Sequence, residues 1–177
     1  MCDVSGHLVS CIGSKVIIWS FEDNESLVGV AFIDVQIFVT SISSIKNFIV
    51  LGDAQKSVWF LGFQLEPAKL VMLGKDYQSF EVSTANFIID DKSMYLLIGD
   101  TDDNLDIFQY APFNLQSFAG QKLMRRGDFH VGSQVRSMVR LPQISRTSDK
   151  YDYNRRHFCL CGKQKEDRER EGEREIC

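Results

Sequence analysis

The densest group of potential ligand side chains in this sequence is an acidic segment that follows an apolar run. Its oxygen-bearing residues are Asp100, Asp102, Asp103, Asn104 and Asp106. A Ca²⁺ loop uses such oxygens, but the segment lacks the glycine at position six and the glutamate at position twelve of an EF-hand. Asp and Asn also tolerate the geometry of tight turns. We therefore predict a β-hairpin turn and no metal site, because the related turn at Gly52 and Asp53 has no such cluster.

A second group of potential metal ligands lies near the C-terminus and consists of His157, Cys159 and Cys161. A structural zinc site takes four ligands, and its cysteines are separated by two to four residues. Here there are three ligands, and the two cysteines are separated by a single residue. The ligand number and the spacing both indicate that this segment holds no zinc.

The three histidines are potential general bases, but none lies in a recognisable catalytic motif. No G-x-S-x-G surrounds His7, His130 or His157, and the chain contains neither a P-loop nor G-x-G-x-x-G. We interpret His130, which ends a predicted strand at residues 122–130, as an interior or rim histidine. The sequence therefore predicts a protein that is not an enzyme, with no cofactor and no small-molecule substrate.

Residues 1–142 are acidic overall, but basic side chains gather near their C-terminal end. These are Lys122, Arg125, Arg126, Arg136 and Arg140. Such a group can contact RNA phosphates or an acidic partner. Equally, Lys and Arg on a solvated strand edge prevent pairing between sheets, and the acidic surroundings favour this second interpretation. The candidate contact residues for RNA or a partner are Lys122, Arg125, Arg126 and His130.

Composition places these residues in one soluble globular domain. The chain has 177 residues, a net charge of −4 and 44% hydrophobic residues. No apolar run approaches the roughly 20 residues that cross a bilayer, so we expect no membrane contact. An odd number of cysteines, five in all, without a secretory signal indicates a reducing compartment.

A repeated hairpin organises the chain. The segment FIVLGDAQKSVWFLGF, residues 48–63, has a counterpart in YLLIGDTDDNLDIFQY, residues 95–110, and a looser copy at residues 6–21. Gly52 and Gly99 occupy the same place, 47 residues apart. A β-hairpin that recurs at this interval is typical of a propeller. Both faces of the hairpin at residues 48–63 are apolar, as expected for a blade packed between neighbours.

Strands flank these hairpins in two sets of four, with a half-set at each end. The segment 27–42 is either one long or bent strand or two short ones. The first set ends with residues 45–51, 57–64 and 69–73, the second comprises residues 80–89, 94–98, 104–110 and 122–130, and residues 132–140 begin a third set. We therefore predict an all-β fold, a partial WD40-like β-propeller of about two to two-and-a-half four-stranded blades with a disordered charged tail.

The charge density changes near Leu141 and Pro142. Residues 1–142 carry 11 basic and 16 acidic side chains, whereas residues 143–177 carry 9 and 8 in a quarter of that length. The run KQKEDREREGERE cannot bury an apolar core. We therefore predict a partial propeller over residues 1–142 and a divergent, disordered tail over residues 143–177.

Four segments resemble the C-terminal region of the large (A) subunit of the cleavage and polyadenylation specificity factor. They are CDVSGHLVSCIGSKVIIWS at 2–20, GVAFIDVQIFV at 29–39, IKNFIVLGDAQKSVWFL at 45–61 and KLMRRGDFHVG at 122–132. The resemblance extends in the same order over residues 1–142.

This resemblance implies a propeller scaffold in the nucleus that takes part in 3′-end processing of pre-mRNA without being the nuclease. Its implied partners are the other subunits of the cleavage and polyadenylation complex, and pre-mRNA directly or indirectly. Related large proteins share the fold, so the alternative is a propeller adaptor of the DNA-damage-binding and ubiquitin-ligase type or of the splicing factor 3b type.

Overall fold

The computed structural model describes residues 1–23, 26–90, 93–143 and 152–163. The described residues form antiparallel sheets joined by short turns, and their only helical element is the 3₁₀ turn η1 (Leu115–Ser117). None of the described helical segments is long and apolar enough to cross a membrane. The predicted all-β fold is confirmed.

Three sheets each contain four strands in chain order. The first consists of β1 (Cys2–Val4), β2 (His7–Ile12), β3 (Lys15–Glu22) and β4 (Ser26–Asp34). The second consists of β5 (Val39–Ile45), β6 (Phe48–Asp53), β7 (Val58–Gln64) and β8 (Lys69–Lys75). The third consists of β9 (Val82–Asp90), β10 (Ser93–Asp100), β11 (Asn104–Gln109) and β12 (Met124–His130).

A fourth sheet pairs β13 (Gln134–Gln143) with β14 (Asp152–Lys163). The strand β14 lies inside the segment 143–177 for which the sequence predicted disorder, so part of that segment is a strand. The long ladder with β13 explains this difference, because it extends the backbone pairing of the folded region past Pro142. The boundary at residue 142 stays a prediction.

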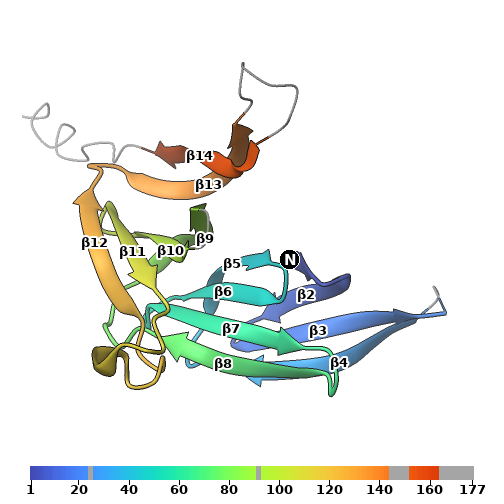
Figure 1. Cartoon of the computed structure of the whole chain (residues 1–177). Coiled ribbons are helices and arrows are strands. Elements are labelled where there is room, and N and C mark those ends of the chain that lie inside the picture. Colours follow the sequence, from blue (N-terminus) through green and yellow to red (C-terminus); the bar gives the residue numbers. More distant parts are fainter. Residues whose placement is uncertain (24–25, 91–92, 144–151, 164–177) are drawn as a thin grey trace, which may run out of the picture.

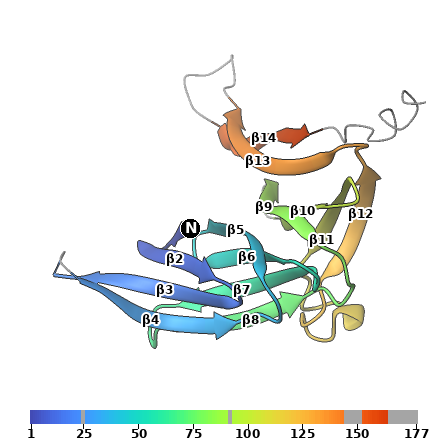
Figure 2. The same ribbon diagram turned by 180° about the vertical axis from the view of Figure 1, so that it is seen from behind.

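The sheets follow one another along an arc, and neighbouring sheets face each other (Figures 1 and 2). The first strands β1, β5, β9 and β13 lie along the inner side, where each contacts the next. Polar side chains join these strands, since Ser41 Oγ accepts from the backbone N of Ala85 at 3.0 Å and Asn86 Nδ2 donates to the carbonyl of Met138 at 3.0 Å. Sheets that meet through their first strands are arranged as propeller blades are.

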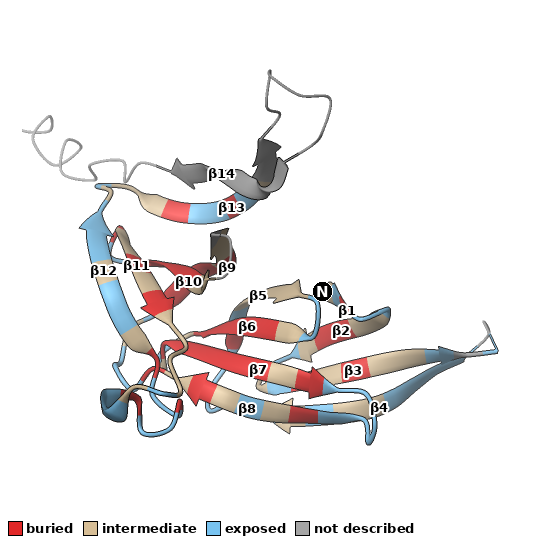
Figure 3. Cartoon of the chain, in the orientation of Figure 1, coloured by how far each residue is buried: buried red, intermediate tan, exposed pale blue. Residues whose placement is uncertain are grey.

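Alternation along β6 and β7 supplies both faces of the second sheet with apolar side chains. Ile49, Leu51 and Leu61 pack toward the first sheet, whereas Val50 and Phe60 pack toward the third. Both strands are therefore buried over most of their length (Figure 3). The sequence predicted this hairpin with two apolar faces, and the prediction is confirmed.

The structure also resolves the alternatives left for residues 27–42. They form two strands in different sheets, with β4 completing the first sheet and β5 beginning the second. The first sheet, which the sequence predicted only as a half-set, therefore has four strands. The count of about two to two-and-a-half propeller blades in this chain stays a prediction.

Candidate partner-contact surface

The candidate contact residues lie on or beside β12, an outer edge strand of the third sheet. Most of β12 is exposed, as the pale blue ribbon in Figure 3 shows. Lys122 lies just before the strand, Arg125 and Arg126 lie near its start, and His130 ends it. The expected solvated strand edge is therefore present, whereas Arg136 and Arg140 lie on β13 of another sheet.

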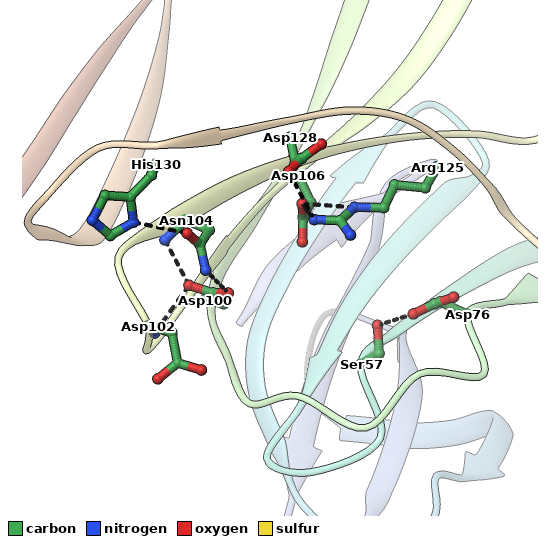
Figure 4. Close-up of polar contacts among 9 residues, drawn as sticks. All are labelled: Ser57, Asp76, Asp100, Asp102, Asn104, Asp106, Arg125, Asp128 and His130. Carbon is green, nitrogen blue, oxygen red and sulfur yellow. Dashed lines mark hydrogen bonds and ion pairs between the residues drawn. The ribbon is translucent and has the colours of Figure 1, made fainter.

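Arg125 is engaged by carboxylates of its own sheet (Figure 4). Its Nε donates to Asp106 Oδ1 at 2.9 Å, and its Nη2 makes a closer contact with the same oxygen. The carboxylate of Asp128 lies 3.7 Å from Nη2. Most of the charge of Arg125 is therefore balanced inside the protein, so this residue is a weak candidate for phosphate contact.

The Asp106 and Arg125 pair perturbs both groups. Burial raises the pKa of the Asp106 carboxyl, and the hydrogen bond from Arg125 opposes that shift. The hydrogen bond to Asp106 in turn raises the pKa of the Arg125 guanidinium, which keeps this group charged. The pair positions β12 against β11 because Asp106 and Arg125 come from these two neighbouring strands.

The remaining candidates differ in how far they are free to contact a partner. Arg126 Nε donates to Gln109 Oε1 at 2.8 Å, and Lys122 is exposed. The ring Nδ1 of His130 lies 2.9 Å from Asn104 Oδ1 and is exposed, so His130 is a rim residue. The structure thus leaves Lys122 and Arg126 as the candidate cations that have no carboxylate at ion-pair distance among the described residues.

The acidic segment forms the turn between β10 and β11. The Asp100 carboxylate accepts from the backbone N of Asp102 at 3.0 Å and of Asn104 at 2.7 Å, and from Asn104 Nδ2 at 2.8 Å (Figure 4). Both Asp100 oxygens are therefore used to close the turn. The described residues contain no group of three or more His, Cys, Asp or Glu that could hold a metal. The predicted hairpin turn is confirmed.

The equivalent turn between β6 and β7 uses the same device. Asp53 is buried and accepts from the backbone N of Gln55 at 3.0 Å and of Lys56 at 3.2 Å. Its other oxygen accepts from the backbone N of Ile37 at 3.1 Å, which ties the turn to the preceding connection. The Gly-Asp signature that repeats in the sequence therefore marks a buried carboxylate that organises each hairpin.

Residues 1–165 match the sequence family described as the CPSF A subunit region. The chain belongs to this family. It is 37% identical over 143 residues to Protein cft1 of Schizosaccharomyces pombe, covering 81% of this chain and 10% of the relative. It is 36% identical over 151 residues to cleavage and polyadenylation specificity factor subunit 1 of Arabidopsis thaliana, covering 85% and 10%, and 34% identical over 163 residues to the subunit of that name in Drosophila melanogaster, covering 90% and 11%.

The chain therefore spans about a tenth of the length of these CPSF-type relatives. Their names agree with the resemblance found in the sequence and do not favour the adaptor of the DNA-damage-binding or splicing factor 3b type. The match also continues past residue 142 to residue 165, across the strand β14.

Sequence reasoning missed two features of this CPSF-family chain. One is the cation–π contact of Lys75, whose Nζ lies 5.0 Å from the ring centre of Trp59 and 4.9 Å from that of Tyr77. The other is the loop between β11 and β12, which exposes several large apolar side chains. No local signal distinguishes that loop from an ordinary connection.

The prediction of no zinc at His157, Cys159 and Cys161 concerns side chains outside the described residues.

Proposed function

We propose that this chain is a non-catalytic scaffold segment of the nuclear machinery that cleaves and polyadenylates pre-mRNA. The family match over residues 1–165 is the observation that carries this proposal. Relatives from yeast, plant and insect that bear the names of this factor match most of the chain and support it further. In this proposal the partners are the other subunits of the complex, and the association with pre-mRNA runs through them.

The geometry supports binding through protein contacts over binding through phosphates. Arg125 is balanced by Asp106 and Asp128, and the whole chain carries a net charge of −4. A surface that holds nucleic acid by electrostatics needs several uncompensated cations. Lys122, Arg126 and His130 are then contact residues for an acidic protein surface, with Arg125 as the residue that positions the strand.

Cleavage of pre-mRNA at its 3′ end offers a direct test of this proposal. The transcript that encodes this chain is depleted in cells, and the 3′ ends of nascent and mature RNA are sequenced. We expect transcripts to extend past their normal cleavage sites, and we expect re-expression of the chain to reverse this effect. Normal 3′ ends together with impaired removal of DNA damage would contradict the proposal and favour the adaptor interpretation instead.

A further inference from the structure

The loop between β11 and β12, residues 111–121, presents large apolar side chains to solvent and is called the apolar loop below. Phe113 is 101% exposed, Leu115 is 95% exposed and Phe118 is 69% exposed. Phe113 and Leu115 have larger exposed fractions than the other large apolar residues that the structure describes. Apolar side chains gathered within six positions of one loop are costly to hydrate, and such a group often marks a contact site.

Buried polar contacts hold the apolar loop in one conformation. Ser117 is fully buried, and its Oγ lies 2.7 Å from the carbonyl oxygens of both Ala111 and Asn114. The same Oγ accepts from the backbone N of Gly120 at 3.1 Å. Asn114 caps η1 by accepting from the backbone N of Gln116 at 2.9 Å. The loop is thus closed upon its own polar atoms.

The backbone of the apolar loop is further fixed at its C-terminal end. Phe118 and Ala119 have φ values of 49° and 58°, which non-glycine residues adopt only at a cost of about 1 kcal/mol or more. Gly120 lies so close to Tyr110 that a Cβ would come within 2.6 Å of its ring. The backbone N of Lys75 donates to the carbonyl of Gln121 at 2.9 Å, which attaches the loop to β8 of the neighbouring sheet.

A loop with these constraints cannot turn its side chains inward to bury them. The energetic cost of ordering a contact loop on binding is therefore already met in the free chain, as it is in preorganised binding surfaces. Rigid aromatic anchors that enter an apolar pocket are the residues that dominate binding energy at protein interfaces. The conformation of the apolar loop fits that role.

The charges beside the apolar loop indicate the rim of its partner. Residues 111–126 contain no acidic residue, in a chain whose net charge is −4. Arg125 is balanced by Asp106 and Asp128, so Lys122 and Arg126 are the cations of this segment that remain for a partner. Lys75, the last residue of β8, lies beside the apolar loop. Its backbone N donates to the carbonyl of Gln121, and its carbonyl accepts from the backbone N of Leu123. An acidic rim around an apolar groove complements this arrangement.

We propose that the apolar loop inserts into an apolar groove with an acidic rim on a folded protein, and that this protein is another subunit of the cleavage and polyadenylation complex. The inference rests on the proposed scaffold function for the source of the partner. RNA fits less well, because the backbone N–H groups of Ser117, Phe118 and Gly120 are paired within the loop and Arg125 is balanced by carboxylates. Few donors remain for phosphates.

The test uses the full 177-residue chain, co-expressed with each of the other subunits of the complex and recovered through a tag on that subunit. The loop variant carries Phe113→Ser, Leu115→Ser and Phe118→Asn, since Asn tolerates the left-handed backbone at that position. We expect one subunit to retain the wild-type chain, and we expect the loop variant to bind it at least about tenfold more weakly. Lys122→Glu should weaken binding several-fold at low salt.

A matched control removes three exposed aromatic side chains away from β12 through Phe21→Ser, Phe32→Ser and Phe38→Ser, whose exposed fractions are 61%, 69% and 53%. We expect this control to bind like the wild type. Equal far-UV circular dichroism of all variants shows that they are folded. Because the substituted side chains are exposed, a change in folding is not expected from any of them.

Any of the following results would overturn the inference. If the loop variant binds the subunit as well as the wild type does, or if the control loses as much affinity as the loop variant, the loop is not the contact site. The scaffold function is not affected by either result. If none of the subunits retains the wild-type chain, the result contradicts both the loop proposal and the scaffold function. A loop variant that loses affinity for a single-stranded RNA oligonucleotide, or loses a dimer seen by sedimentation, while keeping its subunit would assign the loop to RNA or to self-association instead.

Discussion

Removing the ring of Phe60 should produce a large loss of stability, because this side chain fills the space between the second and third sheets. Phe60 is fully buried. Its ring centre lies 5.4 Å from that of Phe48, 6.3 Å from that of Phe87 and 5.3 Å from that of Tyr110. Phe60→Ala therefore deletes a ring that contacts aromatic side chains from β6, from β9 and from the residue that follows β11.

The magnitude follows from burial and cavity formation. A buried Phe→Ala change costs about 3–5 kcal/mol, and a site that cannot collapse lies at the upper end of this range. The strand of Phe60 is paired with β6, and the facing third sheet contains the paired strands β10 and β11. These pairings restrict how far the two sheets can move together to fill the cavity. We expect Phe60→Ala to lower the free energy of unfolding by about 4 kcal/mol, a large part of the roughly 5–15 kcal/mol of a typical domain.

Urea unfolding of the purified chain, followed by tryptophan fluorescence, measures this loss. Trp59 adjoins Phe60 and is itself buried, so its emission reports on the same region. Phe129→Ala is the matched control, because that ring is exposed and its removal should change stability by less than about 0.5 kcal/mol. A loss below about 1 kcal/mol for Phe60→Ala would refute the packing of the two sheets described above.

Three further changes test the same packing and its buried charges. Gly52→Ala places a Cβ 2.4 Å from Val82 Cγ1 and should cost about 1–3 kcal/mol in urea unfolding, with partial rescue by Val82→Ala. Asp100→Ala removes the acceptor of three hydrogen bonds and should cost about 2 kcal/mol in the same assay. Because burial raises the pKa of Asp106 above 3.8, the stability of the wild type relative to Asp106→Asn should rise as the pH falls through the raised pKa, which unfolding at a series of pH values measures.

Each of these results has a clear contrary outcome. Full stability of Gly52→Ala would mean that the two sheets do not approach as closely as described. An Asp100→Ala variant as stable as the wild type would show that the turn closes without its carboxylate. A relative stability that falls with falling pH would reverse the sign expected for Asp106 and indicate that its pairing with Arg125 outweighs burial.

Much of the fold could be predicted because its strands are short, alternating and repeated. The recurrence of Gly52 and Gly99 identified the central hairpins, and the alternation around Phe60 indicated a sheet buried on both faces. The first sheet was harder to predict because β1 has only three residues, too few to show alternation. The strand β14 was missed because the charged run that begins at Lys163 dominated the interpretation of the whole segment, although β14 itself contains the apolar residues 158–161.

The candidate site was predicted less completely, because its chemistry depends on pairing between strands. The register of β11 and β12 shifts at Ile107 and Phe108, and no sequence pattern reveals which carboxylate then faces Arg125. The outward direction of Phe113 likewise depends on the buried hydroxyl of Ser117, which reads in the sequence as an ordinary loop serine. Sequence located the basic residues, and the structure separated Arg125 from Lys122 and Arg126.

The most direct test of the scaffold function is recovery of the tagged chain from nuclear extract after digestion with ribonuclease. Immunoblots for the other subunits of the cleavage and polyadenylation complex give the readout. A scaffold that acts through protein contacts should retain those subunits at the same ratio with and without ribonuclease. Loss of the subunits after digestion, or recovery of a cullin in their place, would contradict the account.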